Sequence, residues 1–304
     1  MIVQAASKHI NSDKIKHVMT EPYYLGVDLG GTQLRMAAVT NAGRLASSMF
    51  SVPTGKEFSP ENLRENLQAL AGIVRAEIGE HPIAAIGVGI TGQVFEIHMG
   101  NSDFLPLLNG VNLIALVTEA LNLPVKIEND ARCFVLAEAR FGAGRGLQNV
   151  VGITLGTGVG GGVIVHGKIV HGANCYAGEV WGIPWRGKWM EHFVSGSGLV
   201  QTYKESGGEG VEIDAAKIAE LARHGDVIAQ KTYDAFAADL WALCETIRSL
   251  LDPDVVVIGG SIANARDVFD EYLQQRLNEN GPNIAWAELG NAAGVIGAAS
   301  LNMD

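Results

Sequence analysis

The chain has 304 residues, of which 47% are hydrophobic and 18% charged, so it can bury a sizeable core and is long enough for two lobes. Its formal net charge of −11 opposes binding to nucleic acid and to anionic membranes, because both are polyanions. No apolar run approaches the roughly 20 residues that cross a bilayer, and residues 1–22 lack the apolar stretch of a secretory signal, so we expect a cytoplasmic protein.

Residues 1–22 are polar and aperiodic, and we interpret them as an N-terminal extension that is too short for a DNA-binding domain. The first part of the chain then alternates strands and helices, which indicates an α/β sheet. We expect a run of three strands over 23–52, a helix over 60–78, a strand over 84–90, a helix over 113–121 and a strand over 125–127.

The second part of the chain repeats this alternation. We expect a helix from about Asp130 to Phe141, a second strand pair around 151–165, helices over 214–223 and 227–251, a buried strand over 255–258, a helix over 265–279 and a last helix from Ala292. The sequence therefore predicts two similar α/β halves with a cleft between them: a small lobe over 23–127, completed by the C-terminal helix 292–304, and a large lobe over 128–291.

Two glycine-rich turns follow buried strands at matching places in the two halves. The first holds Gly30, Gly31 and Thr32, and the second holds Gly156, Thr157 and Gly158. Glycine permits the backbone to bring several N–H donors to one anion, and the threonine hydroxyls add further donors. A single Gly-Gly-Thr turn is usually only a tight hairpin, but two matched copies favour a pair of loops that bind nucleotide phosphates.

Asp28 stands at the end of the buried strand just before the Gly30-Gly31-Thr32 turn, and the segment Gly259-Gly260-Ser261 follows another buried strand. A carboxylate at the place of Asp28 can hold Mg²⁺ through water beside a triphosphate, although it could also simply cap the turn. The glycine pair would let adenine or ribose approach the backbone, with an ordinary strand-to-helix turn as the alternative.

Asn129 and Asp130 stand where a strand ends and a helix begins, so either could serve only as a helix cap. Placed between two phosphate loops, however, Asp130 offers a carboxylate that can accept a hydroxyl proton, and Asn129 offers an amide that can bind neighbouring hydroxyls. This arrangement is typical of phosphoryl transfer, which needs positioning, charge neutralisation and a base.

The cysteines do not indicate a metal site or a disulfide framework. Cys133, Cys175 and Cys244 are widely spaced and form no Cys-x-x-Cys pair. A zinc site could be attempted with His166, His171, Cys175 and His192, but their spacing matches no common zinc pattern, so we expect no zinc site.

Seven segments, in order, resemble the ROK family of repressors and sugar kinases. They are Asp28-x-Gly-Gly-Thr, Glu128-Asn129-Asp130-Ala131, 137–144, 155–162, Gly178-Glu179, Asp252-Pro253-Asp254 with Gly259-Gly260, and 293–299. The resemblance spans about Tyr23 to Ala299. It implies an actin-like ATPase (ribonuclease H-like) fold with duplicated β-hairpin phosphate loops, use of ATP with Mg²⁺, and phosphorylation of a hexose, usually at its terminal 6-hydroxyl, as in a glucokinase. We also expect a homodimer.

The resemblance further implies roles for individual residues. Asp130 would be the general base, Asn129 and Glu179 would bind sugar hydroxyls, Gly92 would line the sugar cleft, and Glu191 takes the place of the family's second sugar-binding glutamate. Asp103 stands where the family tends to have a sugar-binding Asn, which leaves the identity of the hexose open.

The largest departure from the family is in the segment Gly178-Glu179-Val180-Trp181-Gly182. The family's histidine is absent from this segment, and the family's zinc loop is absent after it. Trp181, Trp185 and Trp189 follow instead. Their spacing suggests a helix that the nearby glycines and proline oppose, and we expect aromatic packing to rigidify the loop.

Three alternatives to an ATP-dependent kinase stay open to different degrees. A polyphosphate-dependent hexokinase would need a basic track, for which Arg140, Arg145 and Lys168 are candidates. A sugar-binding sensor without catalysis would explain the missing histidine, but it would need neither Asp28 nor Asp130. A repressor would need a DNA-binding domain before the first strand, and only about 22 residues precede it.

Overall fold

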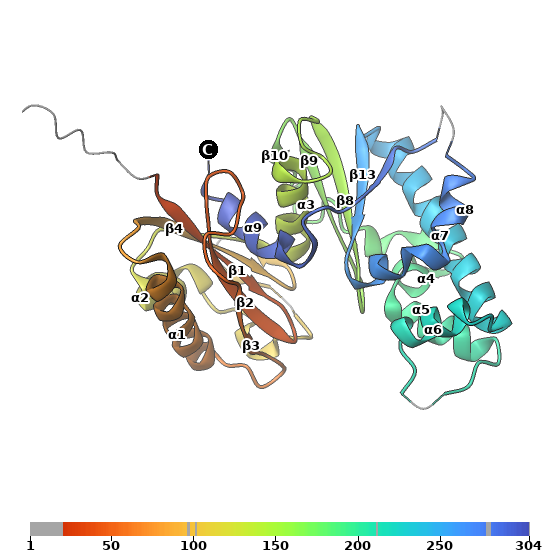
Figure 1. Ribbon diagram of the computed structural model, residues 1–304, viewed down its shortest axis with the longest axis horizontal. Helices are drawn as coiled ribbons and strands as arrows, with labels where there is room; N and C mark the ends of the chain where they lie inside the picture. Colours follow the sequence, from red (N-terminus) through yellow and green to blue (C-terminus); the bar gives the residue numbers. More distant parts are fainter. Residues whose placement is uncertain (1–20, 96–97, 101, 211, 278–280, 304) are drawn as a thin grey trace, which may run out of the picture.

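The computed structural model describes residues 21–95, 98–100, 102–210, 212–277 and 281–303. Within these ranges the chain forms two five-stranded mixed sheets that lie one after the other along the molecule (Figure 1). Almost all of the predicted N-terminal extension, 1–22, lies outside the described residues. No helix in the described part of the chain is long and apolar enough to span a bilayer.

The first sheet has the strand order β3-β2-β1-β4-β7. β1 and β2 form an antiparallel hairpin, and β1, β4 and β7 run parallel. The helices α1 and α2 pack on one face of this sheet through a core of buried leucines and valines. The bounds are β1 Tyr23–Leu29, β2 Gln33–Val39, β3 Phe50–Pro53, α1 Pro60–Ile78, β4 Ile83–Ile90, α2 Leu113–Leu121 and β7 Val125–Asn129.

The second sheet has the order β10-β9-β8-β13-β14 and repeats the plan of the first, with an antiparallel hairpin, β8 and β9, beside the parallel strands β13 and β14. Helices α4 to α8 cover its outer face. The bounds are β8 Asn149–Leu155, β9 Val159–Val165, β10 Lys168–Ile169, α4 Glu191–Val194, α5 Gly196–Glu205, α6 Ala215–Arg223, α7 Val227–Leu251, β13 Val255–Gly259, α8 Asp270–Gln274 and β14 Ile284–Trp286.

Two helices lie between the sheets: α3, Asp130–Phe141, and α9, Ala293–Ser300 (Figure 1). Both belong to one hydrophobic cluster that also includes side chains of β2, β8 and β13. This middle layer therefore joins the predicted lobes, and the lobe boundaries themselves remain a prediction.

Several glycines bring α9 unusually close to the strands beneath it. A Cβ added at Gly26 of β1 would lie 1.9 Å from the carbonyl oxygen of Val295, and one at Gly87 of β4 would lie 1.7 Å from that of Ala298. No side chain fits at either place, so the sheet and the helix backbone touch directly.

Smaller elements connect these layers. They are β5 Val94–Phe95, β6 His98–Met99, β11 Pro184–Trp185, β12 Lys188–Trp189 and the 3₁₀ turns η1 Pro106–Leu108, η2 Val180–Gly182, η3 Ser261–Val268 and η4 Gly290–Ala292.

One predicted helix is wrong, and the predicted C-terminal helix 292–304 is shorter in the structure, where α9 spans Ala293–Ser300. The segment 265–279 was expected to be a single helix, but its first part belongs to the 3₁₀ segment η3, α8 spans only Asp270–Gln274, and 278–280 lie outside the described residues. Phe269 interrupts the helix with φ −141°, because its ring is buried against Tyr233, with 5.9 Å between the ring centroids. Tertiary packing of one aromatic side chain thus overrides the helical propensity of the segment.

Candidate active site

Asp130 is the first residue of α3 and follows β7 directly. Asn129 caps this helix, as the simpler interpretation expected: its Oδ1 accepts the N–H of Arg132 at 3.1 Å, and its Nδ2 donates to the Gly92 carbonyl at 3.0 Å. Asp130 Oδ1 accepts the Ala131 N–H at 2.8 Å and Asn129 Nδ2 at 3.1 Å. The strand end and the cap together fix the direction of the carboxylate.

The pKa of Asp130 is raised from 3.8 to about 6. Desolvation is the main cause, followed by the negative charge of Asp28, while hydrogen bonds from the Ala131 N–H and the Thr91 side chain oppose the shift. A carboxyl group with a pKa of about 6 is ionised at neutral pH and is a stronger proton acceptor than an ordinary aspartate.

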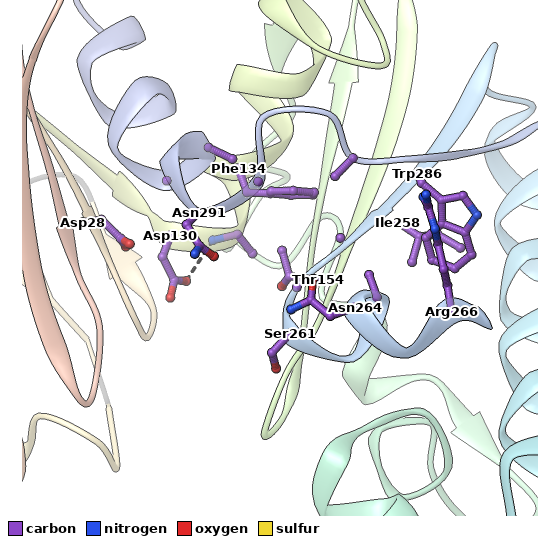
Figure 2. Close-up of a pocket in the computed structure, with 18 of the residues that line it drawn as sticks. Asp28, Asp130, Phe134, Thr154, Ile258, Ser261, Asn264, Arg266, Trp286 and Asn291 are labelled. Carbon is purple, nitrogen blue, oxygen red and sulfur yellow. Dashed lines mark hydrogen bonds between the residues drawn. The ribbon is translucent and has the colours of Figure 1, made fainter. Parts of the chain in front are cut away.

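Two cavities meet at this carboxylate. Cavity A has a volume of about 660 Å³ and runs from Asp28 and Asp130 to Trp286 and Arg266 at its other end (Figure 2). Cavity B has a volume of about 610 Å³ and lies toward Glu179 and Glu191. Both are lined by Asp130, Ala131, Thr154 and Gly260. Asp130 is therefore accessible from either side.

The predicted residues divide between the two cavities. Cavity A contains Asp28, Gly259, Gly260 and Ser261. Cavity B contains the tips of both glycine-rich hairpins together with the predicted sugar-binding residues, namely Gly31, Thr32, Gly92, Asp103, Asn129, Gly156, Thr157, Gly158, Glu179 and Glu191. Gly30 lines neither cavity, and its N–H instead donates to the Gln33 carbonyl at the hairpin turn.

Asp28 lies at the end of β1 and faces the first turn of α9. Burial raises its pKa, and Arg35, with Nη1 3.4 Å from Oδ2, opposes this shift. A Cβ at Gly294 would lie 2.9 Å from the Asp28 carboxylate, so only glycine at position 294 leaves room for this carboxylate. The close approach explains the glycine in the C-terminal motif.

Glu179 is held by two donors in cavity B. Its Oε2 accepts the indole N–H of Trp181 at 2.5 Å, and its Oε1 lies 3.4 Å from Nη2 of Arg132. Burial raises its pKa, against the Trp181 hydrogen bond and the charge of Arg132. Each carboxylate oxygen keeps a lone pair that a ligand hydroxyl can use.

Glu191 connects cavity B to the second hairpin. Its Oε1 accepts the N–H of Val159 at 3.0 Å, and a Cβ at Gly158 would lie 2.5 Å from the same oxygen. The hairpin tip is thus held by a carboxylate that also faces the cavity.

The tryptophan loop is not helical. Trp181 stands in the short 3₁₀ turn η2, and Trp185 and Trp189 stand on the two strands of a small hairpin, β11 and β12. The Trp185 indole donates to Asp239 at 2.9 Å, and Trp189 is half exposed. Polar contacts of Trp181 and Trp185 therefore add to the expected aromatic packing.

Sequence reasoning missed several residues that line the cavities. Thr91 directly follows β4 and precedes Gly92, and this position next to a predicted site residue could have identified it. Phe134, Asn264, Arg266, Trp286 and Asn291 line cavity A, and Phe104 lines cavity B. None stands in a recognisable motif. Arg266 lies over the Trp286 ring, with 5.8 Å from the guanidinium carbon to the ring centroid.

The chain is similar to known sugar kinases over most of its length. The chain is 31% identical to the N-acetylgalactosamine kinase AgaK of Shewanella sp. (strain ANA-3), over 91% of this chain and 96% of that protein. It is also 31% identical to a glucokinase of Halalkalibacterium halodurans, over 93% and 96% of the two chains.

Among solved structures, the chain superposes on a ROK family glucokinase from Streptomyces griseus in complex with glucose and AMPPNP, with a TM-score of 0.75, 28% identity, and 92% of this chain and 98% of that chain covered. The predicted actin-like ATPase fold is confirmed by this similarity. A protein-family model described as the ROK family matches residues 24–304, and the chain therefore belongs to the ROK family.

Proposed function

We propose that the protein transfers the terminal phosphoryl group of ATP to a hexose, at its 6-hydroxyl as in a glucokinase, with Asp130 as the general base. Sugar kinases among the relatives, and a structural neighbour that holds glucose and AMPPNP, support the activity. The observation that carries the proposal is that Asp130 lines both cavity A and cavity B. A nucleotide in one and a sugar in the other would meet at this carboxylate.

Cavity A suits a nucleotide. The Gly259-Gly260 pair stands at the end of β13. Gly260 has φ +92°, and a Cβ there would lie 2.3 Å from the Leu155 carbonyl oxygen. The Trp286 ring and the Arg266 guanidinium offer flat surfaces on which adenine can stack. The triphosphate would then extend toward Asp28 and Asp130.

The residues present fit a Mg²⁺ ion that arrives with the nucleotide. Asp28 is a largely buried carboxylate that forms a long ion pair with Arg35, 3.4 Å between Oδ2 and Nη1, and it would hold the ion through water. The described residues contain no cluster of three or more metal-ligating side chains, and Mg²⁺ bound with substrate phosphates needs only one or two protein carboxylates. When bound, the ion would neutralise charge on the phosphates.

Cavity B suits a hexose. Gly92, Asp103, Asn129, Glu179 and Glu191 surround it with acceptors for hydroxyl groups. The carboxylates would then orient the sugar, and Asp130 would accept the proton of the attacking hydroxyl. The hairpin tips line cavity B, and they would approach only the terminal phosphate, where it reaches Asp130 from cavity A. We further propose that the protein acts in the cytoplasm, where ATP is available, and that it forms a homodimer.

The proposal is tested by measuring ADP production by the purified protein with Mg²⁺ and ATP against glucose, mannose, fructose, allose, glucosamine, N-acetylglucosamine and N-acetylmannosamine. We expect turnover with at least one sugar and a kcat/KM that falls about tenfold per pH unit below pH 6, since Asp130 must be ionised. Sugar binding without turnover would instead favour a sensor. In a parallel assay with polyphosphate in place of ATP, turnover that ATP does not support would favour polyphosphate as the donor.

Gly158→Ala should raise the KM for sugar about tenfold. The added methyl group would lie 2.5 Å from Glu191 Oε1, so the carboxylate must leave the Val159 N–H and its place beside cavity B. Gly156→Ala is the matched control, because its Cβ would meet only ordinary contacts at 3.9 Å or more, and its effect should be clearly smaller. Equal KM values for the two variants would contradict this role of Glu191.

A further inference from the structure

Arg132 joins two parts of the active site that are far apart in the sequence. It stands in the first turn of α3, two residues after Asp130, and its side chain is 1% exposed. Nη2 donates to the carbonyl oxygen of Cys175 at 2.5 Å and to that of Ala177 at 3.5 Å, and it lies 3.4 Å from Glu179 Oε1. One guanidinium thus contacts two carbonyl oxygens of the loop before Glu179 and the carboxylate of Glu179 itself.

Glu128 anchors the other side of this guanidinium. Its Oε1 lies 3.3 Å from Arg132 Nη1 and also accepts the Asn129 N–H at 2.7 Å, while its Oε2 lies 2.5 Å from His171 Nε2. Glu128 is the residue of β7 just before the Asn129-Asp130 pair and is 5% exposed. The segment that carries the base is therefore tied to both ends of the loop 171–179.

This loop has little regular structure of its own. The residues 171–179 form turns, with Cys175 at φ +54° and Gly178 at φ +85°, and they pair with no strand. Ordering such a loop costs conformational entropy that its own turns offset only in part. Contacts from outside the loop must therefore fix the direction in which Glu179 enters cavity B.

We infer that Arg132 is a positioning residue that holds the loop 171–179 and the Glu179 carboxylate in the orientation that binds substrate in cavity B. The inference rests on the proposed function in one respect, which is that Glu179 binds the sugar. Arginine suits this place because its planar fork can serve two carboxylates and two carbonyl oxygens at once, which an ammonium group cannot do.

Removing Arg132 takes away the cation that contacts both the buried Glu128 carboxylate and the part-buried Glu179 carboxylate. Glu128 already raises the pKa of Glu179, and without the guanidinium this repulsion is no longer compensated. Glu179 should then turn away or bind a proton, and the loop should loosen. Asp130 keeps its contacts with Ala131 and Asn129, so the chemical step should suffer less than sugar binding.

The test compares Arg132→Met and Arg132→Lys with Arg140→Met. Arg140 is on the same helix and also binds carbonyl oxygens, those of Ser300 and Met303, but it lies away from the loop. In Arg132→Met we expect the sugar KM to rise roughly 10- to 100-fold, the scale of a lost charged hydrogen-bond partner, with the ATP KM and kcat within about threefold. Arg132→Lys should be intermediate. Arg140→Met should lower thermal stability and leave the sugar KM within about twofold.

The inference is overturned if Arg132→Met has the same sugar KM as wild type. It is also overturned if the sugar KM, the ATP KM and kcat all worsen together in Arg132→Met and to the same extent in Arg140→Met. Hydrogen exchange of peptides covering 171–179 gives a readout that does not need turnover. Faster exchange in Arg132→Lys than in wild type supports the inference, and unchanged exchange refutes it. If Arg132→Met fails to fold, the Lys variant carries the comparison. Wild-type protein inactive on the whole sugar panel would refute the proposed function alone.

Discussion

Asp130→Asn should lower kcat by about 10²- to 10⁴-fold for the hexose that the wild-type protein phosphorylates, with KM values for sugar and ATP within a few-fold of wild type. Asparagine keeps the shape of the side chain, and its Oδ1 can still accept the Ala131 N–H. It cannot accept the hydroxyl proton, however. Steady-state assays of ADP formation with saturating sugar measure the loss directly.

The same variant should be as stable as wild type or more stable at pH 8. The pKa of Asp130 is raised from 3.8 to about 6, chiefly by burial, so the folded protein holds this proton more tightly than the unfolded chain. This contribution to stability is complete below about pH 4 and is lost as the pH rises through 6. At pH 8 the ionised group therefore destabilises the fold by roughly 1–3 kcal/mol, which asparagine avoids. The difference in Tm between the two proteins should shrink toward pH 4.

Glu138→Gln is the matched control on the same helix. Glu138 is fully buried away from both cavities, and its carboxylate accepts the N–H groups of Ala143, Glu288 and Leu289. An amide there places a donor against backbone donors, so this variant should lose stability and keep kcat. An Asp130→Asn protein with wild-type kcat, or one less stable than Glu138→Gln at pH 8, would contradict the assigned role of Asp130.

Gly87→Ala should destabilise the protein by about 3 kcal/mol or more, the upper end of the cost of overpacking. The methyl group would lie 1.7 Å from the carbonyl oxygen of Ala298, and neither β4 nor α9 can relieve this by a side-chain rotation. Because Gly294 of the same helix lies against Asp28, a shift of α9 should also lower kcat. Urea unfolding followed by circular dichroism gives the midpoint and slope.

Gly72→Ala is the control for this change. Gly72 lies inside α1, is exposed, and has no atom within 4 Å of an added Cβ. Alanine there should stabilise by about 0.5–1 kcal/mol, because glycine is the poorer helix former. If both alanine variants shifted the urea midpoint in the same direction, the close contact between β4 and α9 would not be present in solution.

Helices with strong local signals were predicted near the bounds that the structure has. The bounds of α1 agree with the prediction, since Ser59 caps it in a capping box with Asn62 and Pro60 begins it. The bounds of α2 agree too, with Asn112 at its start and Asn122 in the left-handed conformation at its end. β7 runs two residues further than predicted, to Asn129, because its last two residues are polar and do not continue the apolar pattern of the strand. The helix over 265–279 was wrong because Phe269 is fixed by contacts from α7.

The sequence predicted those residues of the candidate site whose positions depend on local backbone conformation, such as turn glycines and helix caps. The glycine turns after buried strands predicted the hairpin tips, and the position of Asn129 and Asp130 at the start of a helix predicted their place in the site. The sequence did not show that the hairpin tips and Glu191 would share cavity B, while Gly259 and Ser261 would line cavity A.

The sequence by itself determined the α/β class, the two hairpins and the place of Asp130, because strand periodicity, glycine turns and helix caps act within a few residues of the chain. Only the tertiary structure decided that Arg132 reaches Glu179, that Arg266 lies over Trp286, and that Gly87 lies against Ala298. These partners stand 20 to 211 positions apart in the chain. Their meeting depends on how α3 and α9 pack between two sheets, and no local propensity encodes that packing.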